Sequence, residues 1–135
     1  MYWVIHISLL GYLSYSAFKY LKSSFKPFVY WSALTLKLAA GVGFCLIFYY
    51  YYGFGDSLIL FEKAVKLSEL NISDHFCELM TDGSYATNNH PRDVFFIKIL
   101  SVLARITGDS YWITSLYLSF SSFLASWFFV SSVSK

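Results

Sequence analysis

Few side chains in this sequence suit acid–base chemistry, and the carboxylates all lie in one segment. The eight acidic residues fall between positions 56 and 109. Asp56 follows a glycine and precedes an apolar stretch with helical spacing. A carboxylate there can act as a general base that takes the proton of an attacking hydroxyl, or it can cap the first turn of the following helix. The residues alone favour the cap, and the two roles are compatible.

Basic side chains farther along the same segment suit phosphate binding. Arg92, Lys98 and Arg105 are the candidates, because guanidinium and ammonium groups pair with phosphate oxygens. Alternatively, basic groups on a surface helix lie among anionic lipid headgroups, which is the favoured interpretation of Lys98 and Arg105. Arg92 lies beside His90 and Pro91, and for it the two interpretations stay even. His90 can ligate or donate a proton, although a solvated loop histidine is the commoner case.

Metal, redox and nucleic-acid chemistry find little support in the sequence. His75 and Cys77 form a lone His-x-Cys pair without a second pair of ligands at zinc spacing. Cys45 lies in an apolar stretch and Cys77 in a polar one, so we expect no disulfide between them. The net charge of +2 is too small to indicate a nucleic-acid partner. We therefore expect no metal site, no cofactor and no nucleic acid.

The elements that position these residues follow from the hydropathy. Hydrophobic residues make up 57% of the 135 residues and charged residues 13%, about half the share of an ordinary soluble domain. Three stretches are long and apolar enough to be predicted as membrane spans, at about 2–21, 30–53 and 111–133. Lys37 is the one charge in the second stretch, and its ammonium can reach the nearer interface. His6, in the first stretch, is expected to reach the outer interface.

The basic residues predict an orientation. Lys19, Lys22 and Lys26 lie between the first two predicted spans with no acidic residue among them. Short basic loops of this kind stay in the cytoplasm. The N-terminus and the 54–110 segment are then extracytoplasmic, and the C-terminus at Lys135 is cytoplasmic. The four tyrosines at 49–52 are expected at the outer interface.

The extracytoplasmic segment carries two amphipathic patterns. Residues 57–70 place apolar side chains at helical spacing, with Glu62, Lys66 and Glu69 on the opposite face. Residues 71–89 read as a loop with at most one short helix near 74–80. A second apolar helix is predicted over 93–107, after Pro91 and before Gly108. The predicted fold is all-α, a single membrane domain over 1–135 with about three transmembrane helices and two amphipathic surface helices.

The order of these elements resembles a known family. The pieces that carry it are YYYYGFGDS at 49–57, HPRDVFFIKILSVLARITGDS at 90–110, and the span from Tyr111. They are similar to the N-terminal part of the integral-membrane C-type glycosyltransferases that use polyprenyl-phosphate sugars, such as the dolichyl-phosphate-mannose and aminoarabinose transferase relatives. The resemblance covers about residues 35–133. It departs at residues 112–116, where many members carry an arginine and this chain has none.

The resemblance implies a function and its site residues. With the resemblance added, the general-base and cap interpretations of Asp56 are even, and the resemblance implies that Arg92, His90, Lys98 and Arg105 lie near the donor phosphate. The family has several times as many spans, so the chain alone would lack the donor and acceptor pockets and be inactive in isolation. The alternative is a small, non-enzymatic membrane subunit that docks a partner through its outer helices. The expected surroundings are a lipid bilayer, a polyprenyl-phosphate sugar donor and partner membrane helices.

Overall fold

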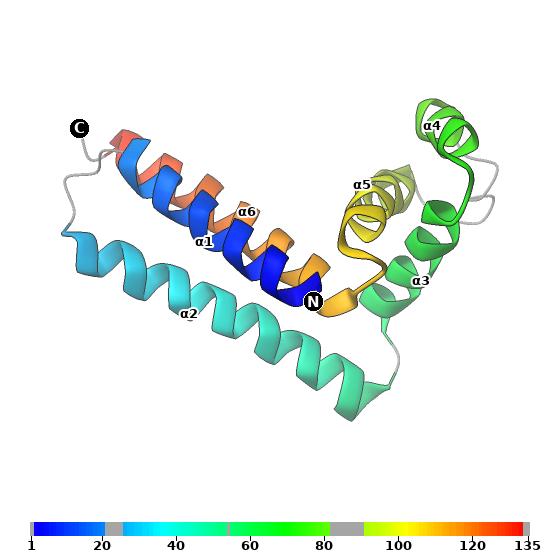
Figure 1. The fold of residues 1–135 in the computed structure, drawn as a ribbon. Helices are drawn as coiled ribbons and strands as arrows, with labels where there is room; N and C mark the ends of the chain where they lie inside the picture. The colour runs from blue at the N-terminus through cyan, green and yellow to red at the C-terminus, as the bar shows by residue number, and fades with distance from the viewer. Residues whose placement is uncertain (1, 21–25, 54, 82–90, 134–135) are drawn as a thin grey trace. The chain divides into compact units, whose positions relative to one another are not determined.

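The computed structural model describes residues 2–20, 26–53, 55–81 and 91–133, and in these residues it contains helices joined by short turns and no strand (Figure 1). The predicted all-α class is confirmed. The elements, in chain order, are α1 (Tyr2–Tyr20), α2 (Pro27–Leu46), the π-helix η1 (Ile47–Tyr52), α3 (Asp56–Ser68), α4 (Ile72–Met80), α5 (Pro91–Thr107) and α6 (Tyr111–Val133). They form two compact units, residues 1–46 with 115–135 (unit 1) and residues 47–114 (unit 2).

Prolines and glycines set several of the helix boundaries. α2 and α5 each begin at a proline, whose fixed φ suits the first turn of a helix. α5 ends at Thr107 because Gly108 follows with a φ of 62°. The amide N–H of Asp109 donates to the carbonyl oxygen of Ala104 at 2.9 Å, which closes the helix in the six-to-one pattern typical of a glycine cap. The predicted bounds 93–107 and 111–133 are therefore close to those observed.

The helix that begins at Pro27 changes its winding within the aromatic run. Residues Ile47–Tyr52 form a π-helix, and the N–H of Gly53 donates to the carbonyl of Phe48, five residues earlier, at 3.1 Å. All four tyrosines of the run are exposed. The sequence did not predict this change, and short π segments are frequently found at functional sites.

Two helices in the described part of the chain are long and apolar enough to cross a membrane. They are the continuous helix Pro27–Tyr52 and α6, which correspond to the second and third predicted spans. The first predicted span, 2–21, corresponds to the helix α1. This helix is not among the two that are long and apolar enough to cross a membrane.

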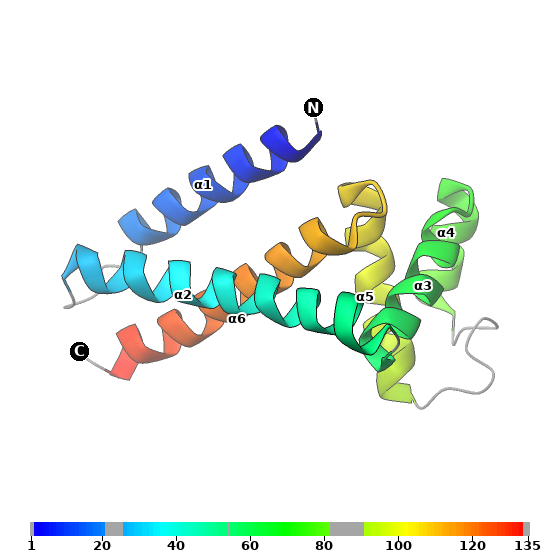
Figure 2. The same cartoon turned by 90° about the horizontal axis from the view of Figure 1, so that it is seen from below.

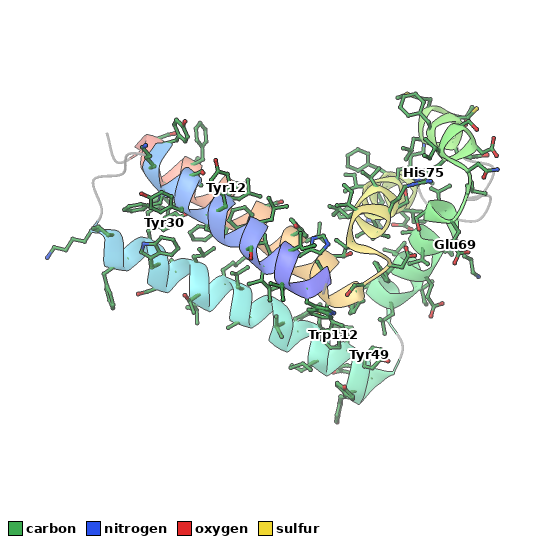
Figure 3. All side chains as sticks on the ribbon, viewed as in Figure 1. Tyr12, Tyr30, Tyr49, Glu69, His75 and Trp112 are labelled. Atoms are coloured by element: carbon green, nitrogen blue, oxygen red, sulfur yellow. The ribbon has the colours of Figure 1, made fainter. Side chains whose placement is uncertain are left out.

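Unit 1 is a three-helix arrangement around one buried tyrosine. α2 runs antiparallel to α1 and α6 (Figures 1 and 2). Tyr30 on α2 is fully buried, and its hydroxyl donates to the carbonyl of Ser14 on α1 at 3.0 Å (Figure 3). Its ring meets Phe123 and Trp127 of α6 edge-on, with centroids 5.2 and 5.0 Å apart. Edge-to-face pairs of this kind add about 1 kcal/mol each to the burial of the rings.

Polar pairs join α6 to the other two helices of unit 1. Nδ1 of His6 lies 2.9 Å from the hydroxyl of Tyr117, and His6 is buried. His6 therefore makes a helix-packing contact inside the unit, and the expectation that it lies near the outer interface stays a prediction. The thiol of Cys45 donates to the hydroxyl of Ser115. A polar group between apolar helices is stabilised only when it is hydrogen-bonded.

Gly41 lets α2 and α6 approach closely. A Cβ atom at this position would lie 2.1 Å from Oγ and 3.0 Å from Cβ of Ser119. Gly43, two residues along α2, has no such neighbour within 4 Å. Small residues at helix crossings commonly permit this approach in membrane proteins.

We expect Gly41→Ala to lower the free energy of unfolding by about 1–3 kcal/mol, because the added methyl overpacks the crossing. Gly43→Ala is the matched control, and it should leave stability unchanged or raise it by up to about 1 kcal/mol through helix propensity. Denaturant unfolding in detergent micelles, followed by circular dichroism, measures both. Equal effects of the two substitutions would contradict the close approach at Gly41.

Candidate functional site

The candidate site lies in unit 2, where α3 packs along α5. The α3 face that meets α5 contains Leu60, Ala64 and Leu67, and the facing residues of α5 are Ile97 and Leu100. The charged face of α3, with Glu62, Lys66 and Glu69, is exposed. The exposed charged residues thus lie apart from the apolar residues of α3 that α5 covers, and a position of this helix at a membrane surface stays a prediction.

Two of the predicted site residues hold the ends of neighbouring helices. The ammonium group of Lys98 donates to the carbonyl of Leu79 at 3.1 Å and also to the carbonyl of Thr81, the C-cap of α4. The Arg105 guanidinium donates to the carbonyl of Leu70 at 3.1 Å, just beyond the C-terminus of α3. Cations are favourable at these ends because the last carbonyls of a helix lack intrahelical partners and carry partial negative charge.

The remaining predicted site residues are Asp56, Arg92 and His90, and the structure describes Arg92 in full but only the backbone of Asp56. Asp56 is the first residue of α3, and Gly55 is its N-cap, without a side-chain capping bond. The helix thus begins one residue earlier than expected, so Asp56 does not hold the cap position. Arg92 is exposed in the first turn of α5 and lies 3.7 Å from the carboxylate of Asp93. The side chain of Asp56 and the whole of His90 lie outside the described residues.

A carboxylate closes the turn between α5 and α6. Gly108 and Asp109 both have a positive φ, 62° and 57°. A left-handed backbone is uncommon for a residue with a side chain, and aspartate is among the residues that tolerate it best. The Ser68 hydroxyl lies 2.9 Å from Oδ1 of Asp109 and 2.7 Å from the carbonyl of Val65. The end of α3 is therefore linked to this turn.

The structure brings together a pair that the sequence did not predict. His75 of α4 is buried, and its Nε2 lies 3.0 Å from the hydroxyl of Ser101, which is fully buried on α5 (Figure 3). That hydroxyl donates to the carbonyl of Lys98 at 2.8 Å, so it accepts from the histidine N–H. The only sequence signal was a histidine at the centre of a short helix. In sequence it stood beside Cys77, which is exposed.

The surroundings of His75 favour its neutral form. Burial lowers the pKa of His75 below its ordinary value of 6.5, and the positive charge of Arg105 lowers this pKa further. A neutral imidazole suits a structural hydrogen bond to serine. Within the described residues no group of three or more His, Cys, Asp or Glu side chains could hold a metal ion.

α4 and α5 also present apolar side chains outward. On α4 the exposed residues are Ile72, Phe76 and Met80, four residues apart on one face. On α5 they include Phe95, Ile99, Val102 and Ile106. Contiguous exposed apolar surface of this kind is typical of a site that meets a membrane or another protein.

No protein-family model, no curated protein and no solved structure matches the chain.

We expect Lys98→Met to weaken the attachment of α4 to α5, because methionine keeps much of the aliphatic stem but donates to neither carbonyl. Losing hydrogen bonds from a charged donor costs on the order of 1.4 kcal/mol, so α4 amides should exchange with deuterium roughly tenfold faster. Hydrogen exchange read by mass spectrometry measures this. Lys66→Met, at an exposed position on α3, should leave α4 unchanged, and equal effects of both variants would rule out the cap.

The attachment of α4 should also weaken in acid. The pKa of His75 is lowered in the folded chain, so below pH 6.5 the unfolded chain binds more protons than the folded chain. The free energy of unfolding therefore decreases as the pH is lowered through this range. Deuterium exchange of α4 amides, corrected for intrinsic rates, should be faster at pH 5.5 than at pH 7.5. His75→Leu should remove this additional pH dependence. A wild-type α4 equally protected at both pH values would contradict the role of His75.

Proposed function

We propose that this chain is the N-terminal portion of an integral-membrane glycosyltransferase that moves a sugar from a polyprenyl phosphate to an extracytoplasmic acceptor. The observation that supports it best is the order of elements around Asp56. A helix able to span a membrane ends at Tyr52, and α3 starts at Asp56. α5 then leads through the Gly108 turn into α6, the next such helix. This order is the one that the resemblance rests on.

The proposed chemistry assigns one role to each of the candidate residues. The acceptor hydroxyl attacks the anomeric carbon of the sugar, the bond from that carbon to the phosphate oxygen breaks, and polyprenyl phosphate leaves. The carboxylate of Asp56 takes the hydroxyl proton as the new bond forms. Arg92 and His90 lie near the departing phosphate, where positive charge stabilises the growing negative charge.

Lys98 and Arg105 can contribute to phosphate binding only with the donors that remain. Lys98 uses two of its three N–H groups on α4 carbonyls. Arg105 gives one hydrogen bond to Leu70, which leaves several guanidinium N–H groups. We therefore assign the larger share of phosphate binding to Arg92, which is exposed and, among the described residues, pairs with Asp93 at the long distance of 3.7 Å.

The membrane arrangement is part of the same proposal. α1 is a third span, less apolar than the other two, and α3 and α5 lie at the extracytoplasmic surface. The short basic stretch between α1 and α2 places the N-terminus outside and Lys135 in the cytoplasm. The outward apolar residues of α5 then contact the outer leaflet.

The test uses the complete enzyme that the proposal requires, encoded by a reading frame that continues beyond Lys135. Asp56→Asn keeps the size of the side chain and removes the base, so sugar transfer should fall by at least about a hundredfold. Transfer of tritiated sugar from a polyprenyl-phosphate donor in isolated membranes measures it. Asp74→Asn, which changes an acidic residue of α4, should keep full activity. An Asp56→Asn enzyme within a few-fold of wild type would overturn the role of Asp56.

A second candidate function is a non-enzymatic membrane subunit that docks a partner protein through unit 2. The exposed apolar face of α4 favours it, because Ile72, Phe76 and Met80 are each at least 60% exposed. Phe76→Ser should then abolish co-purification of a membrane partner while leaving the chain folded. A reading frame that stops after Lys135 would favour this candidate, and one that continues through several hundred apolar-rich residues would exclude it.

A further inference from the structure

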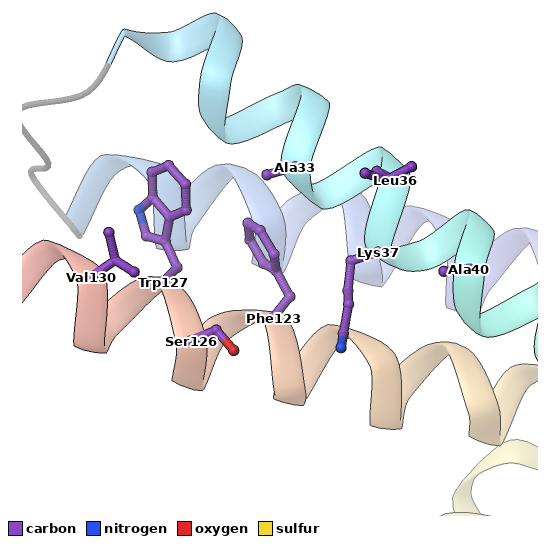
Figure 4. A pocket seen from close by; sticks show the side chains of 8 residues that line it. All are labelled: Ala33, Leu36, Lys37, Ala40, Phe123, Ser126, Trp127 and Val130. Atoms are coloured by element: carbon purple, nitrogen blue, oxygen red, sulfur yellow. The ribbon is translucent and has the colours of Figure 1, made fainter.

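A groove runs between α2 and α6 within unit 1. It has a volume of about 410 Å³ and is lined almost wholly by apolar atoms. Ala33, Leu36 and Ala40 line it from α2, and Phe123, Trp127 and Val130 line it from α6 (Figure 4). The alanines and Ser126 are small, and small residues let another helix approach the backbone closely.

Lys37 is the charged residue of this groove. Its side chain extends from α2 toward α6 across the groove (Figure 4). The residue lies ten positions after Pro27, hence about 15 Å from that end of the helix at a rise of 1.5 Å per residue. Among the described residues no hydrogen bond or ion pair reaches its ammonium.

This chain cannot supply a carboxylate to Lys37 from unit 1. All eight acidic residues lie between positions 56 and 109, outside the segments 1–46 and 115–135 that form the unit. A second copy of the chain would bring none on these helices either. Charged side chains inside a membrane are rare, and they usually pair with an opposite charge or face a polar cavity. The walls of this groove are apolar, so an ammonium that stays in the groove, instead of extending to the interface, finds its pairing group only on the occupant.

We propose that the groove is the docking site of a transmembrane helix that carries a carboxylate, with that Asp or Glu paired to Lys37. The inference rests on the membrane placement of α2 and α6 and is independent of sugar transfer. The small residues admit the backbone of the arriving helix, and Phe123 and Trp127 pack against its side chains. Lys37 selects a helix that carries an Asp or Glu at the matching depth in the membrane. Leu36, 73% exposed, flanks the entering helix.

The experiment uses the full chain in phosphatidylcholine vesicles with a synthetic leucine–alanine peptide of about 20 residues. One peptide carries a single glutamate at its centre and a second carries glutamine there. A donor fluorophore on the exposed thiol of Cys77 and an acceptor on the peptide report association by energy transfer. The glutamate peptide should bind roughly tenfold more tightly than the glutamine peptide.

Variants of the groove decide whether Lys37 and the groove carry that preference. Lys37→Met should remove it, and Lys37→Glu should instead bind a peptide with a central lysine. Ala40→Phe fills the groove while keeping Lys37 and should weaken binding of the glutamate peptide. Ala39→Phe is the matched control on an exposed position that does not line this groove, and it should bind as the wild type does.

Four results would overturn the proposal. Equal binding of both peptides to the wild type is one of them, and a preference that Lys37→Met keeps is another. In the third, brominated phosphatidylglycerol quenches tryptophan fluorescence in a way that depends on Lys37 and displaces the glutamate peptide, which would make an anionic lipid the occupant. In the fourth, the chain fails to insert into vesicles, which would remove the membrane assignment as well. Loss of the Asp56 role alone would leave the proposal intact.

Discussion

The distribution of charge constrains the rest of this molecule. Every carboxylate lies between positions 56 and 109, so the helices of unit 1 have no acidic side chain to use in packing. They are held by the buried Tyr30 ring and by single hydrogen bonds, such as His6 to Tyr117. Unit 2 is held differently, since its cations bind backbone carbonyls at helix ends. The ion pair of Arg92 with Asp93 lies at the surface and contributes little.

The cations of α5 connect the packing of unit 2 to its proposed chemistry. Lys98 and Arg105 lie seven residues apart on one helix face, but they reach the ends of two different helices, α4 and α3. A phosphate that uses the third N–H of Lys98 would leave the cap of α4 in place, and only one that took more than this N–H would compete with the cap. His75 is attached to the same region through Ser101, so the position of α4 depends on both groups.

The sequence predicted the elements better than their contacts. Pro27, Pro91 and Gly108 mark helix boundaries through fixed local geometry, so the observed helices begin or end within a few residues of the predicted bounds. The π-helix at 47–52 has no such marker, because its sequence IFYYYY contains no proline or glycine and no change of apolar spacing that would indicate a different helix type. The pair His75–Ser101 joins residues 26 positions apart, and no spacing rule indicates which two helices will meet. The roles of Asp56 and His90 stay predictions, since their side chains lie outside the described residues.

The two candidate functions differ in where the helix for the Lys37 groove comes from. In a longer glycosyltransferase, the acidic helix would be a later span of the same polypeptide, and it would arrive at high effective concentration. In a docking subunit it would belong to another protein, and the contacts in the groove would have to outweigh the translational and rotational entropy that is lost on association. The pair between the carboxylate and Lys37 is the same in both cases. The affinity that it must provide is lower within one polypeptide than between two proteins. A groove that contributes only a modest preference for an acidic helix is sufficient within one chain, so weak but specific binding of the separate peptide fits the longer enzyme, and tight binding fits the subunit.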